Sequence, residues 1–364
     1  MVVRVLQIVT YMGRGGLETM LMNYYRHINR DKVQFDFLVH RDFEADYDQE
    51  INRLGGKIYH ISRLNPCSPF YREKLKKFLK THQEYKIVHV HQDCLSSVAL
   101  QCAKECGIPV RIAHSHNSNQ NKNIKFLIKK YYMKKIPLYA THLFACGEKA
   151  GDWMFSGEKY EIIHNAIDVK KYTYSREKAR VIREKMHLEN NVVIGHVGRF
   201  DLQKNHVFLL DIFTECIKAI PNAKLLLVGD GEERKDIEAR ARELGINNNV
   251  IFTGVRSDVE DLFQVMDIFV FPSLYEGLPV TMIEAQAAGL PCVISDKVPN
   301  ECIVTSGLVT PMKLSESPHN WAEQIVKSIK IQRKNHLEEI QNSGYDIATE
   351  VGKLEKFYLR NYGE

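Results

Sequence analysis

The sequence predicts an α/β protein of two domains, each built around a parallel β-sheet. The chain has 364 residues, more than one ordinary hydrophobic core supports, so two domains are expected. Short apolar runs rich in Val and Ile alternate with longer helical patterns, as in parallel sheets with crossover helices. The alternation occurs twice, on either side of a polar segment at residues 168–191. We therefore place the domain boundary near Asp168.

Each series of apolar runs supplies the strands of one predicted sheet. The first series covers residues 4–10, 34–39, 57–61, 87–91, 110–114 and 142–146, and a strand-like stretch at 161–164 follows it. The second series covers 192–197, 224–228, 250–252, 268–271 and 292–295. After Ser295 the sheet pattern fades into polar helical patterns. We expect an N-terminal domain over residues 1–167 and a C-terminal domain over residues 168–340.

The composition indicates a globular protein of the cytoplasm. Apolar residues make up 44% of the chain and charged residues 26%, and the net charge of +5 is small for this length, which argues against a nucleic-acid partner. No run reaches the length of a membrane span, and the N-terminus lacks a signal-peptide pattern. The eight cysteines are scattered and resemble thiols of a reducing compartment.

A glycine-rich loop follows the first predicted strand. Gly13, Gly15 and Gly16 precede a helical pattern, where glycine lets the backbone approach a phosphate and helix N–H groups face the anion. A tight turn alone would also require glycine, so both roles remain open. The third glycine comes too early for a dinucleotide fingerprint, and the next strand ends in His40 and Arg41 rather than an acidic residue. This argues against an NAD enzyme.

A basic loop follows the first strand of the second series. Arg199 and Lys204 lie five residues apart between that strand and the next helical pattern. A guanidinium and an ammonium so placed can hold a diphosphate, because ligands of parallel sheets bind beyond the carboxyl ends of the strands. The alternative is an exposed basic loop without a ligand.

Two glutamates flank the start of a later helical pattern. Glu276, Gly277 and Leu278 precede Pro279, which suits the first turn of a helix, so the N–H groups of Gly277 and Leu278 should face phosphate oxygens. Glu284 lies five residues beyond Pro279, about 7.5 Å along the helix. Glu276 would then contact the sugar of a donor and Glu284 its ribose. The alternative for Glu276 is a carboxylate that caps the helix N-terminus, and the alternative for Glu284 is a solvated residue of the helix.

These motifs together resemble the family 4 glycosyltransferases of the GT-B fold. The resemblance rests on five features in the family's order, from about residue 5 to residue 300: Gly15-Gly16, the loop from Gly198 to Lys204, Gly229-Asp230-Gly231, Phe271-Pro272-Ser273 and the glutamates Glu276 and Glu284. It implies two Rossmann-like domains facing across a cleft that holds the active site. A last helix within 341–364 is expected to cross back to the first domain.

The resemblance also implies the chemistry. The family transfers a sugar with retention of configuration from a nucleoside diphosphate sugar, without a bound metal or other cofactor. Arg199 and Lys204 would hold the diphosphate and stabilise its charge, Glu276 would contact the sugar, and Glu284 would bind the ribose. We expect a UDP-sugar donor and a carbohydrate or lipid-linked saccharide acceptor in surface polysaccharide synthesis. The alternatives are a sugar-nucleotide epimerase of similar fold and a non-catalytic nucleotide-binding module.

Two His-x-His pairs end predicted strands of the first domain. By the family match, His114 is the catalytic histidine beside the donor sugar, with His116 as its rival and an acceptor-side candidate. His89-x-His91 and His114-x-His116 also raise the question of zinc. We expect no metal, because no third ligand shows suitable spacing. Asp46-Tyr47-Asp48 matches a metal-binding D-x-D by chance, since it lies in a polar helical stretch.

A basic segment at residues 122–135 mixes lysines with aromatic and aliphatic residues. A helix of this type can lie on an anionic membrane surface, which would place the protein peripherally on the inner face of the plasma membrane. A solvated crossover helix is the alternative.

Overall fold

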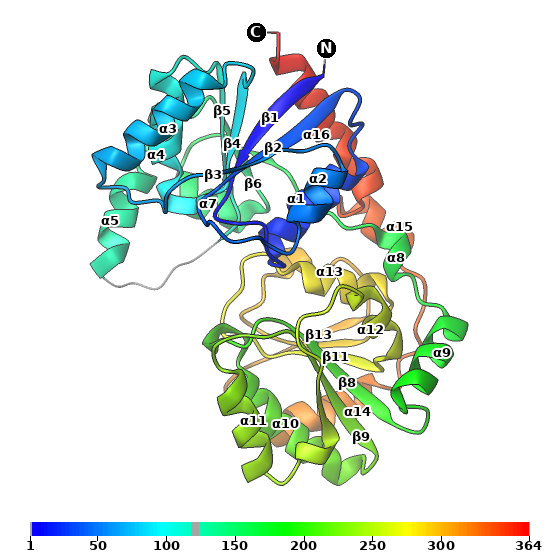
Figure 1. Ribbon diagram of the computed structural model, residues 1–364. Coiled ribbons are helices and arrows are strands. Elements are labelled where there is room, and N and C mark those ends of the chain that lie inside the picture. The colour runs from blue at the N-terminus through cyan, green and yellow to red at the C-terminus, as the bar shows by residue number, and fades with distance from the viewer. Residues whose placement is uncertain (1, 118–123, 364) are drawn as a thin grey trace. The chain divides into compact units, whose positions relative to one another are not determined.

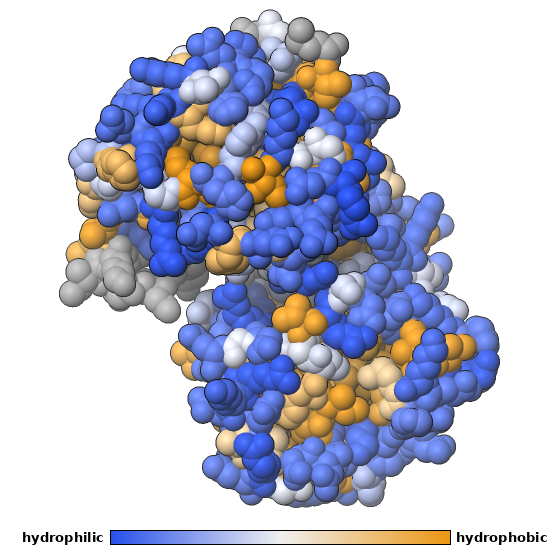
Figure 2. All heavy atoms as spheres, in the orientation of Figure 1, coloured by the Kyte–Doolittle hydropathy of each residue, from blue (hydrophilic) through white to orange (hydrophobic). Residues whose placement is uncertain are grey.

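The computed structural model describes residues 2–117 and 124–363, and these form two compact units (Figure 1). Unit 1 contains residues 1–166 and 346–364, and unit 2 contains residues 167–345. Each unit is an open, parallel α/β sheet covered by helices, as expected for a Rossmann-like domain. Polar residues predominate on the face seen in Figure 2, where apolar residues form small separate groups. Within the described ranges, no helix is both long enough and apolar enough to cross a membrane.

Unit 1 is built on seven parallel strands in the order β3-β2-β1-β4-β5-β6-β7. The strands are β1 Val3–Ile8, β2 Val33–Val39, β3 Ile58–His60, β4 Ile87–Val90, β5 Val110–Ser115, β6 His142–Ala145 and β7 Glu161–Ile162. The helices are α1 Gly16–His27, α2 Asp48–Arg53, α3 Pro69–Thr81, α4 Ser96–Glu105, α5 Ile124–Met133, α6 Ile136–Tyr139, α7 Glu148–Phe155 and α16 Ile347–Asn361. The strand-like stretch before the domain boundary thus forms the edge strand β7.

The sheet of unit 1 is buried on both faces, because side chains alternate along each strand. In β1, Val3 and Val5 pack into a core with α1 and α16, whereas Leu6 and Ile8 pack into a second core with α3 and α4. Helix α16, near the C-terminus, contributes Leu354 and other apolar residues to the first of these cores. The C-terminal helix is therefore an integral part of the N-terminal fold.

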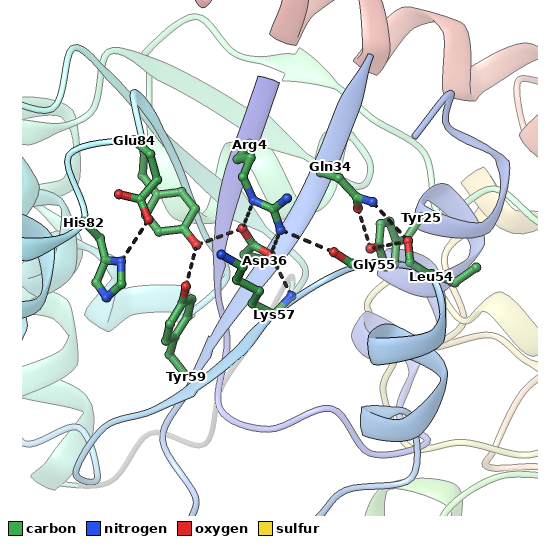
Figure 3. Close-up of polar contacts among 11 residues, drawn as sticks. Arg4, Tyr25, Gln34, Asp36, Leu54, Gly55, Lys57, Tyr59, His82 and Glu84 are labelled. Atoms are coloured by element: carbon green, nitrogen blue, oxygen red, sulfur yellow. Dashed lines mark hydrogen bonds and ion pairs between the residues drawn. The ribbon is translucent and has the colours of Figure 1, made fainter. Parts of the chain in front are cut away.

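A buried carboxylate links the strands of unit 1 (Figure 3). Asp36 on β2 is fully buried, and its oxygens accept bonds from Arg4 Nε at 2.6 Å, the backbone N–H of Lys57 at 2.7 Å and the hydroxyl of Tyr85 at 2.8 Å. The hydroxyl oxygens of Tyr85 and Tyr59 lie 3.3 Å apart. The Asp36 carboxylate is thus paired with a cation and hydrogen-bonded, because a buried charge without such partners would be unfavourable.

Unit 2 is built on six parallel strands in the order β10-β9-β8-β11-β12-β13. They are β8 Val192–Val197, β9 Ala223–Val228, β10 Val250–Phe252, β11 Ile268–Phe271, β12 Cys292–Ser295 and β13 Val309–Met312. The helices are α8 Val169–Tyr172, α9 Arg176–Met186, α10 His206–Ala219, α11 Arg234–Glu243, α12 Val259–Val265, α13 Val280–Ala287, α14 Pro318–Ser328 and α15 Leu337–Asn342. Their core on one face of the sheet includes Trp321 and Phe213.

The expectation that the sheet pattern ends after Ser295 is wrong. Strand β13 pairs with β12 and includes Pro311. Proline cannot donate a ladder hydrogen bond, so it is restricted to positions such as a sheet edge. The strand is short, partly exposed and at the edge of the sheet, which explains why it lacks the apolar run of a central strand.

Candidate active site

In unit 2, the loops that follow β8 and β9 pack directly on each other. The backbone N–H of Gly198 donates to Val228, and that of Phe200 donates to Asp230. Gly229 has φ +136°, and a Cβ built there would lie 2.0 Å from the carbonyl oxygen of Gly198. Close packing and the positive φ therefore require glycine at position 229, which supports a structural role for Gly229 within Gly229-Asp230-Gly231.

The structure brings together Lys204 and Glu276, two of the predicted site residues. Lys204 Nζ lies 2.7 Å from Glu276 Oε1, and both side chains are largely buried. Lys204 Nζ also lies 4.7 Å from the centroid of the Phe271 ring. Each of the two carboxylate oxygens of Glu276 contacts a side chain of the loop after β8, so the pair joins the loops after β8 and β11.

Sequence reasoning missed Gln203 in this site. Its side-chain Nε2 donates to Glu276 Oε2 at 3.0 Å, and its backbone carbonyl accepts from Leu274 N–H at 2.8 Å. Gln203 thus orients the carboxylate whose other oxygen meets Lys204. Only its place beside Lys204 in the loop could have suggested this role. Arg199 lies on the same loop with an exposed side chain.

Helix α13 carries Glu284 and begins slightly later than expected. Pro279 is the N-cap rather than a residue of the first turn. Gly277 and Leu278 therefore lie just before the helix, in the loop that leads into it. The residue after the helix, Ala288, is followed by Gly289 at φ +64°, which suits the predicted C-terminal glycine.

Glu284 is buried, which excludes the solvated alternative. It is 6% exposed, and its Oε1 accepts a hydrogen bond from the hydroxyl of Tyr172 at 2.7 Å. Tyr172 ends α8, the first helix of unit 2, and was not predicted as a site residue. Burial raises the pKa of the Glu284 carboxyl to about 7, although the bond from Tyr172 lowers it.

The raised pKa predicts that donor affinity depends on pH. Ribose hydroxyls would donate to the ionised carboxylate and thus favour it, so protonation below about pH 7 should weaken binding. Affinity for UDP-glucose should rise about fivefold from pH 6 to pH 8 if binding lowers the carboxyl pKa by about one unit. Calorimetry between pH 6 and pH 8 measures the affinity, and Glu284→Gln is the matched variant without a titrating carboxyl. An equally steep profile in that variant would remove Glu284 from the ribose site.

In unit 1, the glycine-rich loop leads directly into α1. Gly15 is the N-cap of the helix, and a Cβ there would lie 2.3 Å from a carboxylate oxygen of Glu18. A Cβ on Gly16 would meet nothing within 4 Å. The Glu18 carboxylate is the far end of a flexible side chain that can move aside, so packing requires glycine at neither position 15 nor position 16.

The Asp46-Tyr47-Asp48 segment has structural roles. Asp46 lies 3.9 Å from Arg14, and Asp48 is buried and accepts from the backbone N–H of Ala45 at 2.9 Å. The Tyr47 ring lies beneath the guanidinium groups of Arg14 and Arg26. These contacts lie at the start of α2.

The four histidines of the two His-x-His pairs meet at the carboxyl ends of β4 and β5. His89 Nε2 lies 3.1 Å from His114 Nδ1, and His91 Nδ1 lies 2.9 Å from His116 Nε2. His114 is fully buried, whereas His116 is half-buried. Burial lowers the pKa of His89, His91 and His114 well below the usual range, so they are neutral at pH 7.

Family models match nearly the whole chain in two parts. A model described as glycosyl transferases group 1 matches residues 177–346, and one described as glycosyltransferase family 4 matches residues 14–171. EpsF of Bacillus subtilis (strain 168), which carries the name of a glycosyltransferase, is 35% identical over 98% of this chain and 96% of its own length. The chain belongs to the family 4 glycosyltransferases.

Two further comparisons agree with this glycosyltransferase family. The UDP-Gal:alpha-D-GlcNAc-diphosphoundecaprenol alpha-1,3-galactosyltransferase of Escherichia coli is 27% identical over 78% of each chain. The crystal structure of Anabaena Alr3699/HepE in complex with UDP and glucose superposes with a TM-score of 0.81 over 98% of this chain and 99% of that chain, at 18% identity. At that identity the likeness shows the shared GT-B fold.

Proposed function

We propose that this glycosyltransferase moves a sugar from a UDP-sugar to a carbohydrate or lipid-linked saccharide acceptor, with retention of configuration, in surface polysaccharide synthesis on the cytoplasmic side of the membrane. The observation that carries the proposal is the buried Lys204–Glu276 pair, which sits in unit 2 at the carboxyl ends of the strands. The Escherichia coli relative is named for a UDP-sugar donor and a diphosphoundecaprenol-linked acceptor, and HepE was crystallised with UDP and glucose.

The proposed chemistry follows from the charges in unit 2. The bond from the anomeric carbon to the diphosphate breaks, and the acceptor oxygen bonds to that carbon while its proton passes to the leaving diphosphate. Arg199 and Lys204 would stabilise the charge that develops on the diphosphate. Glu276 holds Lys204 in place before the donor binds, so little reorganisation is needed when the charge develops. Glu284 would bind the ribose.

The proposal is tested by incubating the enzyme with candidate UDP-sugars and a saccharide acceptor and following products by NMR. An α-linked product from an α-linked donor supports retention, and inversion at the anomeric carbon contradicts it. Conversion of the donor to another UDP-sugar without an acceptor would support the epimerase alternative. Donor binding without transfer, conversion or slow hydrolysis would indicate a nucleotide-binding module.

Transfer should survive a strong chelator. In the proposed site Arg199, Lys204 and backbone N–H groups supply the positive charge that a divalent ion supplies elsewhere. The initial rate with excess EDTA should match that of untreated enzyme. Loss of activity that Mn²⁺ or Mg²⁺ restores would overturn this assignment and return attention to Asp46 and Asp48.

We also propose that the basic segment at residues 122–135 contacts an anionic membrane. Residues 122 and 123 lie outside the described residues. In the described part, Leu127, Ile128 and Tyr131 lie on α5 and have large, exposed side chains. Lys135 Nζ lies 4.1 Å from the centroid of the Tyr131 ring. Exposed apolar and cationic groups on one short helix suit an interfacial location.

Binding to vesicles tests the membrane contact. The enzyme should bind vesicles that contain phosphatidylglycerol more tightly than neutral ones, and salt should weaken this binding. Lys130→Glu with Lys134→Glu should reduce it at least tenfold, since each lysine contributes about 1 kcal/mol. Lys170→Glu with Lys171→Glu, in unit 2, is the matched control. Equal losses in both double variants would refute a specific role for this segment.

A further inference from the structure

Helix α8 carries Tyr172 at its C-terminal end, close to the point where the chain enters unit 2. Unit 2 begins at Ile167, and α8 is its first helix. The backbone at the end of α8 is held by Gln264, a buried residue of α12. Its side-chain Nε2 donates to the carbonyl of Tyr172 at 3.1 Å, and its Oε1 accepts from the backbone N–H of Ser175 at 2.9 Å. The position of Tyr172 is therefore fixed through both ends of one buried amide.

The side chain of Tyr172 extends from α8 to the carboxylate of Glu284 on α13. Its ring packs on that of Phe263, with ring centroids 6.0 Å apart, and its hydroxyl donates to Glu284 Oε1 at 2.7 Å. Among the residues that the structure describes, Glu284 Oε2 has no hydrogen-bond partner. A largely buried carboxylate oxygen gains most from a ligand that donates a hydrogen bond. Tyr172 thus leaves this carboxylate with one occupied and one available oxygen.

The ionisable groups around Glu284 have opposite effects on its carboxyl. Burial raises the pKa to about 7, the bond from Tyr172 lowers it, and the like charge of Glu260 on α12 raises it. The charged side chains of the helices that pack against α13 are otherwise directed elsewhere: Lys170 and Lys171 of α8 and Glu338 of α15 are exposed, and Glu339 of α15 bonds His336. The Tyr172 hydroxyl is therefore the group that favours the ionised carboxylate.

We propose that Tyr172 is a positioning residue of the donor site, which holds Oε1 of Glu284 and leaves Oε2 to accept from the ribose hydroxyls. This inference rests on the proposed function, because it takes Glu284 as the ribose ligand. A hydrogen bond to the ionised form of a carboxyl stabilises that form. Tyr172 therefore acts twice on one carboxylate: it fixes the orientation of the group, and it keeps more of the group ionised near pH 7.

Titration of Glu284 in the donor-free enzyme tests the positioning role. In enzyme labelled with ¹³C at the glutamate carboxyls, the NMR signal of Glu284 is the one missing from Glu284→Gln. Its pKa should rise further in Tyr172→Phe, which keeps the ring and loses the donated bond. A 3-fluorotyrosine in place of Tyr172 has a more acidic hydroxyl, donates more strongly and should lower the pKa, and it keeps the test decisive if Tyr172→Phe folds poorly. An unchanged pKa in both variants would overturn the proposal.

The affinity for UDP-glucose is the second measurement. If the carboxyl pKa rises by about one unit, Tyr172→Phe should bind this donor about fivefold more weakly at pH 7 and almost normally at pH 8.5, where the carboxyl is again ionised.

The matched control is Tyr174→Phe, which removes a hydroxyl of the same segment and keeps the ring that lies 3.8 Å from the Arg333 guanidinium. This control should change neither the pKa of Glu284 nor the affinity for UDP-glucose. A loss in Tyr172→Phe that is equal at both pH values would contradict the proposal. A raised pKa with unchanged affinity would support the positioning role but remove Glu284 from the ribose site, so failure of the proposed function is distinguishable.

Discussion

Replacing His114 by alanine is expected to leave the affinity for free UDP nearly intact and to reduce transfer about 100-fold or more, the loss typical of a positioned catalytic group. The proposed diphosphate and ribose ligands all lie in unit 2, whereas His114 lies on β5 of unit 1. A residue that contacts the reacting sugar but not the nucleotide should affect kcat and spare nucleotide binding. Calorimetry with UDP and initial rates of transfer measure the two effects separately.

The control for this prediction is the neighbouring histidine. His116→Ala should have a smaller effect on transfer, and thermal unfolding of both variants separates lost function from lost structure. This matters because His114 is fully buried and bonded to His89, so truncation can also destabilise unit 1. A folded His114→Ala enzyme with normal transfer contradicts the assignment. Normal transfer in His114→Ala beside an inactive His116→Ala would move the catalytic role to His116.

Lys204→Ala should reduce kcat by about 10²–10³ while weakening donor binding much less. Lys204 would stabilise charge that develops only as the diphosphate leaves, so its loss should affect the transition state more than the ground state. The variant also removes the ion pair with Glu276, whose other oxygen keeps its bond from Gln203. Single-turnover kinetics separate binding from chemistry.

Two further variants define what Lys204 contributes. Lys218→Ala removes an exposed lysine of the same unit and should leave transfer unchanged. If Lys204 and Glu276 act as a unit, the double variant Lys204→Ala with Glu276→Gln should reduce kcat by less than the product of the two single fold reductions. Equal losses in kcat and donor affinity for Lys204→Ala would make this lysine a binding residue only.

Local patterns predicted the fold class because each strand is a local feature. An apolar run such as Ile268–Phe271 is buried on both faces in any parallel sheet with helices on both sides, so it is recognisable without its neighbours. The edge strand β13 was missed for the same reason, because it is partly exposed and contains Pro311. The GT-B fold and the glycosyltransferase family were also identified correctly from motifs that lie at strand ends.

The sequence by itself determined the two parallel-sheet units, the family and the loops that carry the candidate site. Only the tertiary structure decided which side chains meet: Lys204 with Glu276 across 72 positions, Glu284 with Tyr172 across 112, and His89 with His114 across 25. The roles of Gln203 and Tyr172 became visible in this way. The physical reason is that periodicity and glycine placement report each residue's own backbone and burial, whereas hydrogen bonds depend on which strands and helices the fold places side by side.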